Sequence, residues 1–340
     1  MYKLFILSVN LPAYALLWTL MNESEIRKDY FKDKYVIISP KRSKRPRQIK
    51  KSTDQESNQI CYFCPQNFTE ENITYQDNNE NGDWEIVSII NKFSALTLDN
   101  ERAYGQCEVI IETRKHGLDI NDFSVDHIMR ILDAYIDRYN ALRQIDKVQY
   151  VIIFKNEGGK AGASITHTHS QLIALPMVPP KVLSESNDYH RYRAKNGTCP
   201  YCDIIIKETD GPRIVWEDEN LFALAPYASE SPYEVWLIPK RHINQISYLT
   251  REEKLSFSTA LKTILNKLDE LGIAYNYFVE NTINDKDYHM HIKIEPRPNI
   301  WAGLELGTGI IINPISPEFA SKTYRNEIEN EDTVKKIAVL

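Results

Sequence analysis

Hydrophobic residues recur at intervals of three and four positions along two stretches of this 340-residue chain. The first stretch begins at Ser124 and runs to about Arg143, and the second runs from Thr250 to Leu271. Apolar residues at this spacing share one face of a helix, and Ser and Thr commonly cap a helix at its start. We therefore predict two amphipathic helices, the second of which is stopped by Gly272.

Shorter runs rich in β-branched and aromatic residues predict strands. They span residues 34–39, 84–91, 106–113, 148–155, 234–242 and 275–280. The run at 148–155 is apolar almost throughout, so we expect a strand that is buried on both faces. Residues 52–82, which are rich in Asn, Gln and Glu, predict a loop, and residues 178–195 predict a connector between two units.

The second unit repeats the first. Its strand EVWLIPKRH, at 234–242, aligns with EVIIETRKH at 108–116. In both units a Cys-x-x-Cys pair comes before this strand, and a long helix and a His-x-His motif come after it. We therefore predict two halves of similar architecture, at 21–180 and 181–340.

The composition describes a protein that forms a hydrophobic core, since 42% of its residues are hydrophobic and 26% are charged. The formal net charge of −6 argues against a nucleic-acid binder, which needs a basic field to neutralise phosphates. A basic cluster at residues 41–47 fits either a solvated loop or a clamp for phosphate, whose oxygens match the forked donors of arginine. A zinc-stabilised RNA-binding protein is disfavoured, because no aromatic stacking residues accompany the cluster.

Residues 1–20 are mostly apolar but contain Asn10 and Pro12. Three interpretations fit: a signal-like segment, a membrane helix that is slightly short, or a false extension ahead of a true start at Met21. We favour the third, because paired thiols of the metal-binding type suit a reducing compartment. We accordingly expect a cytoplasmic protein that does not enter a membrane and that is active without residues 1–20.

Four of the five cysteines form two Cys-x-x-Cys pairs, and histidines follow each pair in the same order. Zinc takes four nitrogen or sulfur ligands in a tetrahedron, so the repeat predicts two structural zinc sites per chain. Their ligands are expected to be Cys61, Cys64, His116 and His167 in the first half, and Cys199, Cys202, His242 and His289 in the second. His291 competes with His289, and free buried thiols beside strand-capping histidines are the alternative. The fifth cysteine, Cys107, is expected in the core.

The stretch NEGGKAGASITHTHSQ, at 156–171, joins a glycine-rich loop to three polar residues at alternating positions. In a strand, His167, His169 and Gln171 point to the same face. The glycines allow a ligand such as a phosphate to approach the backbone closely. Taken alone, the pattern also fits a plain metal site or a polar face. In the catalytic interpretation it sets a metal ligand, a nucleophile and an amide donor in one row.

Several motifs occur together and in order: EIRKDYFKDKYVIISPKRSKRP, NKFSAL, YGQCEVIIETRKH, NEGGKAGASITHTHSQ, HMHIK and AGLELGTG. In these motifs the chain resembles the galactose-1-phosphate uridylyltransferases, a branch of the histidine-triad superfamily. The resemblance implies an α+β fold of two fused histidine-triad-like halves, each an antiparallel sheet with a packed helix, and usually a homodimer. It also implies transfer of a nucleoside monophosphate from a nucleoside diphosphate sugar to a hexose 1-phosphate, through a nucleotidyl-histidine.

The resemblance also assigns roles to particular residues. It makes His169 the nucleophile and His167 a zinc ligand, while Gln171, Ser164 and Asn156 contact the nucleotide phosphates. The remaining implied contacts are Arg42 and Arg45 at a substrate phosphate, Asn91 near the nucleoside, and Glu305 at the sugar hydroxyls across a dimer interface.

The chain departs from the family pattern in several places. Thr168 stands where a proline is usual, Ser170 stands where a glycine is common, and the second half has a Cys-x-x-Cys pair of its own. The ELGTG motif is closer to the branch that includes the ADP-glucose phosphorylases, which use inorganic phosphate as acceptor. The nucleobase, the sugar and the acceptor therefore stay open, and a non-catalytic nucleotide-binding protein is the rival from another class.

Overall fold

The computed structural model describes residues 23–28, 35–39, 60–69, 71–282 and 285–328. The predicted phosphate contacts Arg42 and Arg45, and the apolar segment 1–20, lie outside these ranges.

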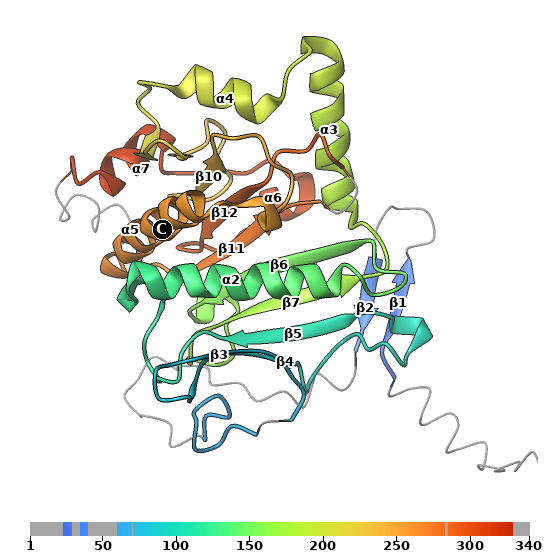
Figure 1. Cartoon of the computed structure of the whole chain (residues 1–340). Helices are drawn as coiled ribbons and strands as arrows, with labels where there is room; N and C mark the ends of the chain where they lie inside the picture. The colour runs from blue at the N-terminus through green and yellow to red at the C-terminus, as the bar shows by residue number, and fades with distance from the viewer. Residues whose placement is uncertain (1–22, 29–34, 40–59, 70, 283–284, 329–340) are drawn as a thin grey trace, which may run out of the picture.

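One antiparallel sheet of ten strands forms the centre of the described part of the chain (Figure 1). Its strand order is β3–β4–β5–β7–β6–β11–β12–β10–β9–β8. A separate two-stranded sheet pairs β1, Glu25–Lys28, with β2, Tyr35–Ile38.

The strand order reveals two equivalent halves. The first half holds β3 (Ile73–Asn78), β4 (Trp84–Ile90), β5 (Gln106–Ile111), β6 (Tyr150–Glu157) and β7 (His169–Leu175). The second half holds β8 (Ile214–Glu217), β9 (Leu221–Leu224), β10 (Val235–Pro239), β11 (Tyr275–Glu280) and β12 (His291–Pro296). From either edge inward the connectivity is the same, and the halves meet where β6 pairs with β11. The predicted α+β fold of two fused halves is confirmed.

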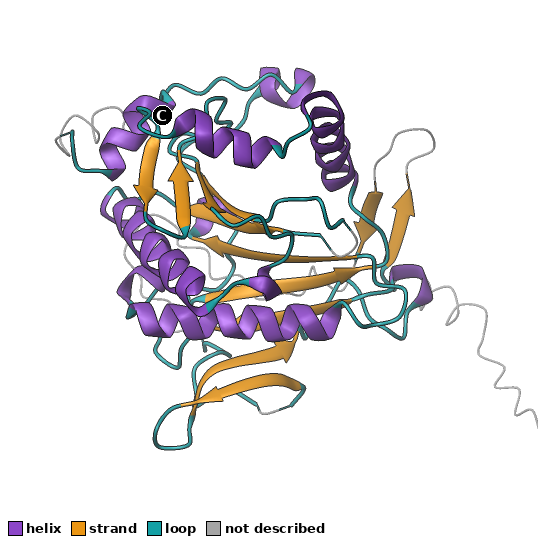
Figure 2. Ribbon diagram, turned by 45° about the horizontal axis from the view of Figure 1, so that its top comes forward, coloured by secondary structure: helices purple, strands orange, loops and turns teal. Residues whose placement is uncertain are grey.

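Two long helices cover one face of this sheet and lie side by side (Figure 1, Figure 2). Helix α2 spans Val125–Leu142 and helix α5 spans Arg251–Glu270. The hydroxyls of Ser124 and Thr250 accept hydrogen bonds from backbone N–H groups of the first turn, which have no partner within the helix. Both helices that the hydrophobic spacing predicts are therefore confirmed.

The core lies between these two helices and the sheet. Each central strand contributes apolar side chains from one face, and the fully buried Ile110, Ile153, Leu172, Leu237 and Ile292 are examples. Because side chains alternate along a strand, the residues next to these point to the opposite face. The helices thus leave the second face of the central strands open for polar side chains.

Two predicted features are wrong, and a third has a form that was not predicted. Residues 73–78 form the edge strand β3 within the predicted loop, and their polar sequence carries no apolar run because this strand is only partly buried. The predicted connector does join the two halves, but most of it is helix α3, Pro180–Asn196, which buries little apolar surface. Strand β6 is buried on the helix side at Val151 and Ile153, but Phe154 on the other face is only half-buried.

Several short elements complete the fold. Helix α4, Pro200–Glu208, begins within the second cysteine pair, and helices α6, Gly303–Thr308, and α7, Pro317–Tyr324, follow the last strand. Short 3-10 turns lie at Glu101–Ala103, Ile120–Asp122, Gly159–Ala161 and Ile246–Tyr248. The part of the chain that the structure describes contains no helix with the length and hydrophobicity that a bilayer span requires.

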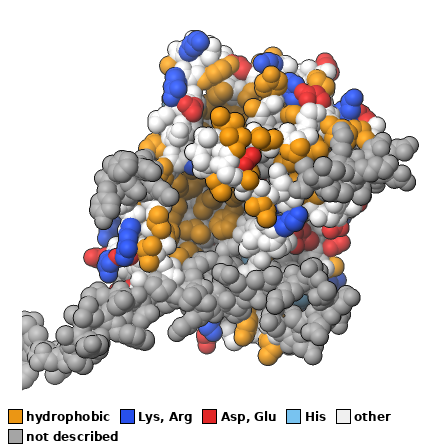
Figure 3. Space-filling model, turned by 180° about the vertical axis from the view of Figure 1, so that it is seen from behind, with side chains coloured by type: hydrophobic (Ala, Val, Ile, Leu, Met, Phe, Trp, Pro, Cys, Tyr) orange, Lys and Arg blue, Asp and Glu red, His pale blue; other side chains and the backbone are white. Residues whose placement is uncertain are grey.

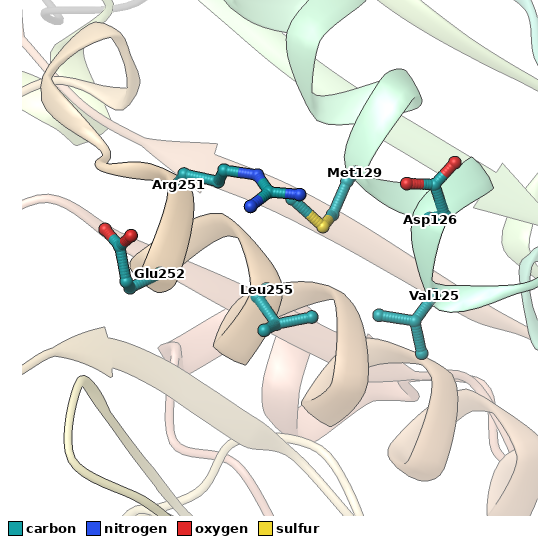
Figure 4. A pocket seen from close by; sticks show the side chains of 6 residues that line it. All are labelled: Val125, Asp126, Met129, Arg251, Glu252 and Leu255. Atoms are coloured by element: carbon teal, nitrogen blue, oxygen red, sulfur yellow. The ribbon is translucent and has the colours of Figure 1, made fainter.

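A groove lies between the first turns of α2 and α5 (Figure 4). It is lined by Val125, Asp126, Met129, Arg251, Glu252 and Leu255. Because these helices cover the sheet face that lacks the predicted histidines, the groove plays no part in the site described below.

Candidate active site and metal centres

The predicted histidine row lies on the sheet face opposite the two long helices. The pairing of β7 with β6 sets Gln171 opposite Phe154. If this register is continued by two residues, Asn156 on β6 lies beside His169 on β7, on the same face of the sheet. His167 precedes β7, so the prediction of one strand holding all three residues is wrong in that detail. Its place ahead of the strand lets its ring face the first cysteine pair.

Both Cys-x-x-Cys segments pack over this same face, one on each half. In the first half, Phe63 packs into a cluster with Val109 and Ile111. In the second half, Tyr201 packs into a cluster with Ile238. Seen from this side, hydrophobic side chains gather in a hollow of the surface (Figure 3).

The first predicted metal set comes together in the structure. The ligand atoms of Cys61, Cys64, His116 and His167 all lie within 4.8 Å of one another. The Nδ1 atom of His167 lies 3.6 Å from both sulfurs, and the Nδ1 atom of His116 lies 3.4 Å from the sulfur of Cys64.

The second set repeats this arrangement. Cys199, Cys202, His242 and His289 also have their ligand atoms within 4.8 Å of one another. The Nδ1 atom of His289 lies 3.5 Å from each sulfur, so His289, and not His291, belongs to the cluster. Cys107 is buried in a separate apolar cluster, as predicted.

These distances fit a tetrahedral zinc ion. Zinc binds thiolate sulfur at about 2.3 Å and imidazole nitrogen at about 2.0–2.1 Å, so a tetrahedron separates sulfur from nitrogen by about 3.6 Å. The measured sulfur–nitrogen separations are 3.4–3.6 Å. Two Cys2His2 clusters are therefore able to bind metal, and among the described residues each offers four ligands, the number of a closed structural site.

Backbone carbonyls orient the histidine rings of both clusters. The Nε2–H group of His167 donates to the carbonyl of Thr113 at 2.8 Å, and that of His289 donates to Pro239 at 2.9 Å. This fixes the proton on Nε2 and leaves the lone pair on Nδ1, which faces the sulfurs. Burial lowers the pKa of His167, and the neutral ring is the form that binds a metal.

His169 has the opposite tautomer. The residue is 5% exposed, and its Nδ1 atom lies 2.8 Å from the backbone carbonyl oxygen of His167. Nδ1 therefore carries the proton and donates it, while Nε2 carries the lone pair. Phe63 packs edge-on against the ring at 5.3 Å between centroids. The tautomer of His169 is thus set by His167 of the first cluster, and its ring packs against Phe63, which lies between the two cysteines of that cluster.

The glycine-rich loop approaches its neighbours closely. Gly158 and Gly162 have φ angles of 81° and 84°, a region that favours glycine, and a Cβ atom on Gly158 would lie 2.8 Å from the Cβ of Ala274. Just after this loop, the hydroxyl of Ser164 is buried and has no hydrogen-bond partner among the described residues. A buried hydroxyl without a partner is costly, so a ligand oxygen at this point would satisfy it.

The second half has an equivalent position, but aromatic side chains occupy the space beside its histidine. His291 is fully buried, and the ring of Tyr201 lies 4.3 Å from its centroid, with Trp236 and Tyr288 at 5.9 and 6.2 Å. Glu280 lies opposite His291 in the β11–β12 pairing, in the position that Asn156 occupies beside His169. Burial raises the pKa of Glu280, and the sequence carries no glycine loop here.

Comparison with known proteins identifies the family of the chain. The N-terminal domain of galactose-1-phosphate uridyl transferase matches residues 17–179, and its C-terminal domain matches residues 185–297. An ADP-glucose phosphorylase from Arabidopsis thaliana is 32% identical over 329 residues, which cover 88% of this chain and 92% of that protein. The chain belongs to the galactose-1-phosphate uridyl transferase family. It is accordingly a nucleotidyltransferase.

Further members of the family show the same relationship. A galactose-1-phosphate uridylyltransferase from Thermotoga maritima is 29% identical over 90% of this chain and 99% of its own length. The crystal structure of the Arabidopsis ADP-glucose phosphorylase with bound ADP-glucose superposes with a TM-score of 0.72, covering 90% of this chain and all of that one. A uridylyltransferase structure gives 0.74 at 27% identity over 89% of this chain and 97% of that one.

The remaining predicted substrate contacts lie on separate elements of the fold. Asn91 follows β4, and its backbone N–H donates to the carbonyl of Cys107, which places it two strands from β7. Glu305 lies on α6, where its carboxylate accepts a hydrogen bond from the backbone of Ala302. The structure therefore sets Asn156 and Gln171 on the same sheet face as His169 and places Ser164 between the glycine-rich loop and β7, while Asn91 and Glu305 lie on other elements.

A buried polar network on the helix side of β7 was not predicted. Thr168 and Ser170, which flank His169, both donate hydrogen bonds to Glu112. Lys155, which is fully buried, lies 2.8 Å from Glu112 and 3.0 Å from Asp119. The only sequence signal for this network was a lysine within an otherwise apolar strand, and the strand pairing that gives it meaning is not visible in the sequence.

Proposed function

We propose that this family member transfers a nucleoside monophosphate from a nucleoside diphosphate sugar to a hexose 1-phosphate, by a ping-pong mechanism through nucleotidyl-His169. One observation carries the proposal: the lone pair of His169 is on Nε2, on a ring whose other nitrogen is held by the carbonyl of His167. A neutral imidazole held in this way is a competent nucleophile near pH 7.

In the first step, Nε2 of His169 attacks the α-phosphorus of the nucleoside diphosphate sugar. A bond forms between nitrogen and phosphorus, and the bond from this phosphorus to the bridging oxygen breaks. The electron pair leaves with sugar 1-phosphate, and no proton needs to move. The ring gains positive charge, which the hydrogen bond from Nδ1 to the His167 carbonyl stabilises.

In the second step, a phosphate oxygen of the acceptor attacks the same phosphorus and the imidazole leaves. We assign the donors around the phosphates to Gln171 and Asn156, which share a sheet face with His169, and to Ser164, whose buried hydroxyl follows the glycine-rich loop. Arg42 and Arg45 would add positive charge at the phosphates, and Asn91 would approach the nucleoside. The orphaned Ser164 hydroxyl supports this arrangement.

The two Cys2His2 clusters are proposed to hold one zinc ion each, with a structural role. When bound, zinc would cross-link each Cys-x-x-Cys segment to the sheet. In the first half this holds Phe63 against the ring of His169 and fixes the chain just before β7. Thiolate ligands also favour a reducing compartment, and we place the protein in the cytoplasm.

We further propose a homodimer in which Glu305 reaches the sugar hydroxyls of the partner's site. Apolar side chains around α6 support this, since Ile300, Leu306 and Ile310 are 87%, 74% and 64% exposed. An apolar patch of this kind is typical of an interaction surface. Sedimentation of the full chain and of Leu306→Glu tests the proposal: a dimer that becomes a monomer supports it, and a monomeric wild-type chain contradicts it.

A second candidate function is phosphorolysis, with inorganic phosphate as the acceptor in the second step. The similarity to the ADP-glucose phosphorylase from Arabidopsis and the AGLELGTG motif favour it. The chemistry at His169 is the same in both cases. The two functions therefore differ only in what binds after the first product leaves.

A panel of nucleoside diphosphate sugars, each offered with hexose 1-phosphates or with inorganic phosphate, tests these proposals. Turnover with a hexose 1-phosphate supports the transferase, and turnover with inorganic phosphate supports the phosphorylase. Binding of a nucleotide sugar without covalent labelling of the chain would contradict both and would leave a non-catalytic nucleotide-binding protein.

A further inference from the structure

A chain of hydrogen bonds links the second half of the protein to the site of the first. Asn276 on β11 lies directly opposite Asn156 on β6. Its Nδ2 group donates to Oδ1 of Asn156 at 2.7 Å and to the carbonyl of Ala161, in the glycine-rich loop, at 2.9 Å. Its Oδ1 accepts from Nε of Arg297 at 2.6 Å.

The donor and acceptor properties of these side chains fix the direction of each hydrogen bond in the series. A guanidinium can only donate hydrogen bonds, so Arg297 requires the oxygen of the Asn276 amide to face it. The amide nitrogen of Asn276 must then face the other way, towards two groups that can accept. Asn156 therefore turns its own oxygen to β11. The orientation of both amides follows from this network, in which Arg297 allows only one arrangement.

This orientation determines which atom of the Asn156 amide is presented towards β7. With its oxygen engaged by Asn276, its Nδ2 group is left on the side of His169, which neighbours it in the sheet. We propose that Asn276 and Arg297 are positioning residues, which hold the Asn156 amide so that it donates to the phosphate transferred to His169. This inference rests on the proposed function.

The same residues also hold the glycine-rich loop. Besides the bond from Asn276 to Ala161, Nζ of Lys160 donates to the carbonyl of Pro298 at 2.9 Å. Glu295 accepts from Arg297 at 2.7 Å and keeps the guanidinium in place. Residues on and after β12 thus fix both the loop and the amide that flank the phosphate position.

The first half has no amide at the position equivalent to Asn276. Phe154 and Phe278 face each other in the β6–β11 pairing, and counting outward from this pair makes Ile152 the counterpart of Asn276. An isoleucine cannot orient an amide. The second half, whose own histidine is enclosed by aromatic rings, therefore contributes to the site of the first half and receives nothing equivalent in return.

Asn276→Asp tests this inference with almost no change of shape. A carboxylate can only accept, so Asn156 would rotate to donate to it and would present its oxygen to the phosphate. We expect the rate of His169 labelling by a nucleoside diphosphate sugar, and kcat/KM, to fall about tenfold to a hundredfold, as for a lost hydrogen bond to a charged group. Metal content and melting temperature serve as controls for folding.

A double-mutant cycle with Asn156→Ala decides whether the effect passes through Asn156. In the Asn156→Ala background, Asn276→Asp should change kcat/KM by less than about threefold. Arg297→Met should also lower kcat/KM in the wild-type background, whereas Arg297→Lys, which still only donates, should restore much of it. Equal losses from Asn276→Asp in both backgrounds would overturn the inference. A wild-type chain that no nucleoside diphosphate sugar labels would overturn the proposed function, and this inference with it.

Discussion

His167 and His169 are joined by one hydrogen bond, from Nδ1 of His169 to the backbone carbonyl oxygen of His167, at 2.8 Å. The side chain of His167 lies in the first Cys2His2 cluster, so the same residue contributes its ring to a cluster able to bind metal and its carbonyl to the proposed nucleophile. Any change that loosens the cluster should therefore act on the orientation of His169. Under the proposed function, this coupling gives a physical reason for a metal-binding cluster beside the nucleophile.

Metal analysis of the purified chain should find about two zinc ions, one for each closed cluster. Cys64→Ser should remove one ion and lower the midpoint of thermal unfolding, because binding of a structural metal contributes to folding. Cys107→Ser is the matched control, since Cys107 lies in a separate apolar cluster and should leave the metal content at two. A chain with no zinc would contradict the account of both clusters.

Lys155→Met should destabilise the fold by about 3–5 kcal/mol, because it leaves buried carboxylates without their cation. Lys155 is fully buried between Glu112 and Asp119. Urea unfolding measures the change, with Lys207→Met on the exposed side of α4 as the control. A loss below about 1 kcal/mol would show that the ion pair is not needed to hold the polar network behind β7.

The carboxyl group of Glu157 should make the stability of the protein depend on pH. Burial and the neighbouring Asp119 raise its pKa from 4.5 to about 7 in the folded chain. The folded state then binds more protons than the unfolded state between these values, so this carboxyl lowers stability as the pH rises from about 4.5 to about 7. Glu157→Gln should therefore gain stability at pH 8, by at most about 3 kcal/mol, and little at pH 4.5. An equal gain at both pH values would contradict the assignment.

The sequence predicted the parts of the site that depend on local spacing. Two cysteines three positions apart and alternating histidines are visible as motifs, and their repetition predicts both clusters. The helices were also predicted, because their apolar spacing agrees with the way they pack on the sheet.

The sequence could not predict contacts that depend on pairing between distant strands. Asn276 reaches Asn156 only because β11 pairs with β6, more than a hundred residues away along the chain. Lys155 ends a mostly apolar run, and only the fold places Glu112 and Asp119 beside it. Polar elements such as β3 and α3 were missed for a related reason: they bury too little apolar surface to leave a periodic signal.

The central claim is that His169, and not its counterpart His291, carries the nucleotide. The chain should be incubated without acceptor, with a nucleoside diphosphate sugar radiolabelled at its α-phosphate, and the bound label measured after denaturation. The account predicts an acid-labile, base-stable adduct, as expected for a phosphorus–nitrogen bond. His169→Asn should abolish the label and the turnover while keeping two zinc ions, and His291→Asn should keep the label. Label that survives His169→Asn would contradict the account.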